Sequence, residues 1–213
     1  MSFGLNHFLI SLAVISYGMS QFLFSLTFSI QIAGVLNQSK NTAASFENIM
    51  NIGSTAMMAA FLPAITYLVE QELSLKPYLL IVAISLNLSF FCHILLRRNL
   101  AFITAYFLTV IRAYQRERSM PKAMLLVGVQ RSDFKTSSIE ASGSLNQIKD
   151  QFSLKYFLAS FVFTIPIASG VFISFLFALL FPDNRLLLSQ TSILIHGFGQ
   201  FFYGTLHRAS YHE

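Results

Sequence analysis

The chain has 213 residues, of which 54% are hydrophobic and only 11% are charged, and its formal net charge is +5. A soluble domain normally carries about 25% charged residues, so this composition excludes an ordinary water-soluble globular domain. The charges are clustered, and the uncharged runs between them approach or exceed the ~20 residues that a helix needs to cross a bilayer. We therefore predict an all-α, polytopic integral membrane helix bundle with about five transmembrane helices and a single membrane domain over residues 1–213.

The first candidate span is Leu5–Leu36. It is longer than a straight crossing requires, so we expect it to tilt, to emerge from the membrane or to bend near Gly18. A signal peptide has a basic start and a shorter apolar core, so we interpret this segment as a retained helix. A weakly polar loop, Asn37–Ile52, is expected to follow it.

Four further spans are predicted from apolar runs that end at charged or turn-forming residues. They are Gly53–Val69, Pro77–Leu96, Tyr156–Phe181 and Leu186–Leu206. The run Pro182-Asp183-Asn184-Arg185 is typical of a turn and is expected to join the last two.

The segment Leu100–Tyr114 is apolar but too short to cross a membrane alone. Its large apolar residues recur at helical spacing: Leu100, Ile103, Phe107, Val110 and Tyr114. We expect an amphipathic helix that protrudes beyond the third span or lies in the interface, and a re-entrant crossing is the alternative. Farther along, the polar stretch Ser132–Ser153 is expected to be a mobile loop or a short polar helix.

Ten of the fourteen Lys and Arg residues fall between Arg97 and Lys155. The positive-inside rule therefore predicts that the loop 97–155 is cytoplasmic, with the C-terminus inside and the N-terminus outside. The same rule explains the net positive charge, so we expect no nucleic acid partner. The small, Cys-poor chain suggests a bacterial inner (cytoplasmic) membrane.

The last span carries an ordered polar face. Its members lie three or four residues apart, on one arc of a helix: Ser189, Ser192, His196, Gln200, Tyr203 and His207. In lipid such side chains need water or a partner, so the stripe either lines a polar path or forms hydrogen bonds between helices.

A second polar face, on the third span, contains Ser85, Ser89 and Cys92, with His93 at its edge. The favoured interpretation is that its Ser hydroxyls bond to the backbone of their own helix, and a role in chemistry is the alternative. Small residues repeat every four positions at Ala56, Ala60 and Ala64, and at Gly170 and Ser174. Such ladders favour close helix packing, within one chain or between subunits.

No catalytic residue is predicted, because the phosphate-loop, zinc-protease and nucleophile-elbow motifs are absent from the sequence. Ser189 and His196 stand about 10 Å apart along one helix, too far to act as a nucleophile and its base. His93 and His196 raise the possibility of haem, but no further haem-binding residues accompany them. We therefore expect no enzyme, no cofactor and no metal.

Three hypotheses for function remain. The first is a small homo-oligomeric pore or channel whose path follows the polar face of the last span. The second is a non-catalytic membrane assembly, regulatory or immunity-type partner protein. The third is an intramembrane enzyme or haem protein. The expected partners are the lipid bilayer and either a second copy of the chain or another membrane protein.

Overall fold

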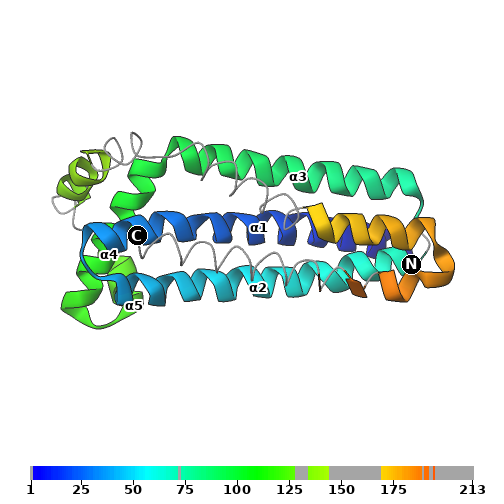
Figure 1. Cartoon of the computed structure of the whole chain (residues 1–213), viewed down its shortest axis with the longest axis horizontal. Helices are drawn as coiled ribbons and strands as arrows, with labels where there is room; N and C mark the ends of the chain where they lie inside the picture. The colour runs from blue at the N-terminus through cyan, green and yellow to red at the C-terminus, as the bar shows by residue number, and fades with distance from the viewer. Residues whose placement is uncertain are drawn as a thin grey trace. The chain divides into compact units, whose positions relative to one another are not determined.

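The computed structural model describes residues 2–71, 73–127, 134–143, 169–188, 190, 191 and 194 (Figure 1). Every regular element in this part of the chain is helical, which confirms the predicted all-α class there. The elements are α1 (Ser2–Leu36), α2 (Lys40–Glu70), α3 (Leu75–Arg98), α4 (Leu100–Glu117), α5 (Met120–Val127) and the 3-10 turn η1 (Pro182–Asn184). Residues 134–143 and Ser169–Leu180 are also helical.

Three helices of the described chain, α1, α2 and α3, are long and apolar enough to cross a membrane. At a rise of 1.5 Å per residue they measure about 52, 46 and 36 Å, against a hydrocarbon core of about 30 Å. They correspond to the first three predicted spans. Most of the predicted spans 156–181 and 186–206 lies outside the described residues, so a total of five spans stays a prediction.

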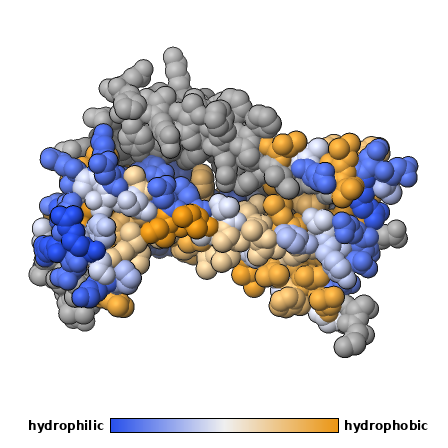
Figure 2. Space-filling view, turned by 90° about the horizontal axis from the view of Figure 1, so that it is seen from below, coloured by the Kyte–Doolittle hydropathy of each residue, from blue (hydrophilic) through white to orange (hydrophobic). Residues whose placement is uncertain are grey.

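Large apolar side chains are exposed on these helices, and Figure 2 shows hydrophobic surface of this kind on the face in view. On α3 only 22% of the residues in its most apolar stretch are buried. The exposed residues include Leu80, Phe90 and Phe91. A soluble monomer rarely exposes apolar surface on this scale, whereas a bilayer covers it without cost. The three helices are therefore compatible with a membrane protein.

The loop predicted at Asn37–Ile52 is wrong for most of its length, because α2 begins at Lys40. Many residues in this stretch are polar, but Ala43, Phe46 and Met50 lie at helical spacing and pack in a core cluster with α4. The polar composition of this stretch suggests a loop, whereas the spacing of its few apolar residues is that of a helix. Glu47, on another side of the same helix, accepts a 2.9 Å hydrogen bond from Nε2 of Gln31 in α1.

Only a short turn separates α1 from α2. The N–H of Ser39 donates to the carbonyl of Gly34 at 2.9 Å, and the N–H of Gln38 donates to Val35 at 3.1 Å. Gln38 has a φ of 51°, in the left-handed region. These three features together form a Schellman motif, which ends α1 and reverses the chain. The helix itself runs without interruption through Gly18, where a bend was one of the expectations.

α4 follows α3 after the single residue Asn99 and is a separate helix. Of the predicted apolar stripe, Phe107 and Val110 are buried in a cluster that also contains Ile30 of α1, Phe46 of α2 and Ala123 of α5. Protein therefore covers this face of α4, so it is not presented to a bilayer. The helix at 134–143 agrees with the short polar helix that was one reading of Ser132–Ser153.

The described chain divides into two compact units. The first contains Met1–Ser16, Ala60–Asn87 and the described residues from Ser169 onward. The second contains Tyr17–Ala59 and Leu88–Gln151. Each of the three long helices contributes residues to both units.

Candidate functional site

The polar face predicted on the last span lies outside the described residues. Its members are Ser189, Ser192, His196, Gln200, Tyr203 and His207. A polar path and a set of interhelical hydrogen bonds both stay predictions for this stripe.

The polar residues predicted on α3 are described, and their environments differ. In the first unit, Ser85 is fully buried, and its Oγ has no hydrogen-bond partner within the described structure. In the second unit, Ser89 is buried and His93 is exposed. The expectation that these hydroxyls bond to their own helix is therefore not met at Ser85.

His93 connects α3 to α1 in the second unit. Its Nδ1 lies 3.0 Å from the carbonyl oxygen of Ser89, and its Nε2 lies 2.8 Å from Oγ of Ser25. A carbonyl only accepts, so Nδ1 carries a hydrogen. The Ser25 hydroxyl also donates to the carbonyl of Gln21 at 2.7 Å. With Nδ1–H donating to Ser89, Nε2 of the neutral ring is an acceptor, so the single Ser25 proton has two possible acceptors, Nε2 of His93 and the carbonyl of Gln21.

Ser25 and His93 are as close as a catalytic nucleophile and its base, a pair that sequence reasoning did not consider. Both residues stand on continuous α-helices, where backbone N–H groups are used in the helix and cannot form an oxyanion hole. Within the described chain no carboxylate orients His93. The contact therefore fits a hydrogen bond between helices better than acyl transfer.

Ser20 of α1 and Ser54 of α2 form a second polar contact in the same unit. The Ser54 hydroxyl donates to the carbonyl of Ser20 at 3.0 Å, and the two Oγ atoms lie 2.9 Å apart. Because the Ser54 proton is used, the Ser20 hydroxyl donates to Oγ of Ser54. Both side chains are buried, so this reciprocal pair joins α1 to α2.

The two predicted small-residue ladders are placed differently. On α2, Ala56 is exposed, Ala60 is half-buried and Ala64 is buried. Gly170 and Ser174 are both buried, and Ala178 continues their spacing by four and is fully buried. The Ser174 hydroxyl donates to the carbonyl of Gly170 at 3.1 Å, within its own helix.

Arg112 of α4 is the centre of a polar cluster that sequence reasoning missed. Its guanidinium donates to Oδ1 of Asn37 at 3.2 Å, to Oγ of Ser137 at 3.2 Å and to Glu140 at 2.6 Å. Asn37 in turn donates to Gln115 at 3.1 Å. The available signal was the position of Arg112 inside an apolar run, because a charge in such a place usually needs a partner.

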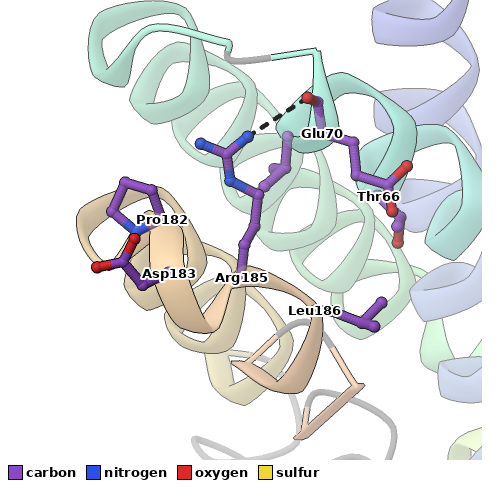
Figure 3. A pocket seen from close by; sticks show the side chains of 7 residues that line it. Thr66, Glu70, Pro182, Asp183, Arg185 and Leu186 are labelled. Atoms are coloured by element: carbon purple, nitrogen blue, oxygen red, sulfur yellow. Dashed lines mark hydrogen bonds between the residues drawn. The ribbon is translucent and has the colours of Figure 1, made fainter.

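A pocket of about 260 Å³ lies in the first unit, beside the end of α2 and the turn η1 (Figure 3). It is lined by Thr66, Val69, Glu70, Pro182, Asp183, Arg185 and Leu186. Nη1 of Arg185 donates to the carbonyl oxygen of Glu70, the last residue of α2, at 3.3 Å. Sequence reasoning identified the turn but not the Arg185 contact, which joins residues 115 positions apart.

No group of three or more His, Cys, Asp or Glu side chains that could hold a metal ion occurs within the described ranges. Comparisons of the chain with protein-family models, with curated proteins and with solved structures find no match.

Proposed function

We propose that this chain is a multi-pass membrane protein that neither conducts nor catalyses, and that it acts as an assembly or regulatory partner of another membrane protein. The main support is that polar side chains on α1, α2 and α3 in the second unit form hydrogen bonds from one helix to another. Ser20 bonds to Ser54, and Ser25 bonds to His93.

A hydrated path requires polar groups that face water, whereas polar groups that face another helix hold helices together. The two hydrogen-bonded pairs belong to the second kind. Each such contact in lipid contributes about 0.6–2 kcal/mol to the association of helices. These side chains therefore support a scaffold whose helices are fixed to one another, as a partner protein requires.

A homo-oligomeric pore is the second candidate, because the sequence places an ordered polar stripe on the last predicted span. In that case His196 and Gln200 would face the path, and the buried ladder of Gly170, Ser174 and Ala178 would bring helices close together. Conduction would then depend on the last helix and not on the contacts of α1 with α2 and α3.

Reconstitution of the purified full chain into liposomes separates the two candidates. We expect ion flux no greater than that of protein-free liposomes. Extraction of the chain with its surrounding lipid should also yield a complex that contains one other membrane protein in a fixed ratio. Flux that falls in His196→Ala and Gln200→Ala but not in Leu194→Ala, a matched apolar position on the same predicted helix, would establish the pore instead.

A further inference from the structure

Arg185 has more hydrogen-bond donors than the described structure uses. A guanidinium carries five N–H groups, and within the described residues only Nη1 has a partner, the carbonyl of Glu70. Nε is buried and unpaired within the described residues. Because Nε is enclosed by the protein, a ligand in the pocket meets the guanidinium at its Nη groups, and Nη2 has no partner within the described residues. The guanidinium also matches the geometry of phosphate oxygens, which it binds through two parallel N–H groups.

Two carboxylates line the same pocket, those of Glu70 and Asp183. The described structure contains no ion pair between either of them and Arg185, although all three belong to one pocket. The pocket therefore offers one cationic group and two separate anionic groups. A ligand with a single negative charge would meet net repulsion here, whereas a ligand with both an anionic and a cationic group is complementary.

The surroundings of the pocket are apolar. Its neighbours along the chain include large side chains that are 52–66% exposed: Leu180, Phe181, Leu186 and Leu187. Glu70 ends the apolar helix α2, and Phe181 directly follows the apolar helix Ser169–Leu180. The change from apolar helix to charged turn marks the depth at which lipid headgroups lie.

We propose that this pocket binds the headgroup of a phospholipid that carries a primary ammonium group, as in phosphatidylethanolamine. The phosphate oxygens accept hydrogen bonds from the Nη groups of Arg185. The ammonium group donates to the carboxylate of Glu70, because the side chain of Asp183 lies on the other side of Arg185 (Figure 3). The acyl chains lie along exposed apolar residues such as Leu186 and Leu187. The assignment does not depend on whether the chain is a partner protein or a pore.

The test is a titration of the delipidated full chain in detergent with three lipids that have identical acyl chains, followed by native mass spectrometry. The lipids are phosphatidylethanolamine, phosphatidylcholine and phosphatidylglycerol. We expect phosphatidylethanolamine to bind about tenfold more tightly than the other two. All three lipids have a phosphate, but only phosphatidylethanolamine also has ammonium N–H donors. Equal or tighter binding of phosphatidylglycerol would overturn the proposal.

Arg185→Gln should lower the affinity for phosphatidylethanolamine about tenfold. Lys76→Gln is the matched control, since it removes an exposed cation of the same unit that does not line the pocket. Equal losses in the two variants would contradict a specific site.

Glu70→Gln provides an independent measurement, because Arg185 bonds to the backbone of Glu70 and that bond survives the change. This variant should bind phosphatidylethanolamine and phosphatidylcholine more nearly alike, whether or not Arg185→Gln folds. An unchanged preference for phosphatidylethanolamine would refute the role of the carboxylate. Displacement of the lipid by equimolar glycerophosphoethanolamine would show that the occupant is a soluble molecule and would overturn the lipid assignment.

Discussion

Gly34 of α1 lies directly against Ala43 of α2, across the turn that joins the two helices. A Cβ at position 34 would be 2.3 Å from the Cβ of Ala43, which cannot rotate away. We therefore expect Gly34→Ala to force the helices apart and to lower the stability of the purified protein by about 1–3 kcal/mol, measured by thermal unfolding in detergent. Gly4→Ala is the control on the same helix, because a Cβ there meets nothing within 4 Å. Equal losses in both variants would mean that the contact is not tight.

Gln38 should be replaceable by glycine with a gain in stability. Its φ of 51° lies in the left-handed region, which costs an L-residue about 1–2 kcal/mol. The side chain is exposed, so little is lost with it. Glycine gains freedom in the unfolded chain, which offsets part of the strain that the substitution relieves. We therefore expect Gln38→Gly to raise the stability by about 0.5–1 kcal/mol. Gln38→Ala keeps the Cβ and should change nothing, and an equal gain from alanine would refute backbone strain as the cause.

The sequence predicts best where charge and apolar runs alternate sharply. α3 is an example, because Lys76 and the pair Arg97 and Arg98 bound a clean apolar stretch, and the helix extends from Leu75 to Arg98. The start of α2 was missed because the stretch from Lys40 to Ile52 has few apolar residues. Those residues are buried by α4, which lies far along the chain, so composition alone could not identify their environment.

The candidate sites were harder to predict, because they join residues that are distant in sequence. Arg112 and Asn37 are 75 positions apart, and Ser25 and His93 are 68 positions apart. Helical periodicity tells which residues share a face of one helix, but not which face of another helix they meet. The ordered stripe was therefore found on the last span by periodicity, whereas contacts such as that of Ser25 with His93 were not.

Ser85→Ala should stabilise the protein. The Ser85 hydroxyl is fully buried and has no hydrogen-bond partner in the described chain, so its removal relieves a desolvation cost of about 1–3 kcal/mol. A rise in the unfolding temperature is the expected result. Ser45→Ala serves as the comparison, because the Ser45 hydroxyl is exposed and donates to Asn41 of its own helix, and we expect almost no change. A loss of stability in Ser85→Ala would mean that the hydroxyl has a partner.

The pair Ser20 and Ser54 is suited to a double-mutant cycle. Each single alanine variant leaves the other hydroxyl buried without its side-chain partner, so the two losses should not add. We expect a coupling energy of about 0.6–2 kcal/mol between the two positions, measured from the unfolding of the four proteins in detergent. A cycle of Ser20 with Ser45 is the control and should give a coupling near zero. Additivity within the first cycle would show that the pair does not hold α1 to α2.

Arg112 should matter more through its geometry than through its charge. Its ion pair with Glu140 is partly open to solvent, with side chains 27% and 45% exposed, and such pairs contribute only about 0.2–1 kcal/mol. The same guanidinium also reaches Asn37 and Ser137, a three-way arrangement that the compact ammonium group of lysine cannot reproduce. We therefore expect Arg112→Lys to lower the stability by about 1–3 kcal/mol although it keeps the charge, and Glu140→Gln to lower it by less than 1 kcal/mol.

Thermal unfolding at low and high salt checks this order. High salt should reduce the small effect of Glu140→Gln, because it screens the ion pair, and should leave most of the effect of Arg112→Lys. Lys122→Gln removes an exposed cation of α5 and should be neutral at both salt concentrations. If Arg112→Lys and Glu140→Gln were equally destabilising and equally sensitive to salt, the ion pair alone would account for the cluster. The directed hydrogen bonds from Arg112 to the α1–α2 turn would then contribute nothing to holding α4 in place.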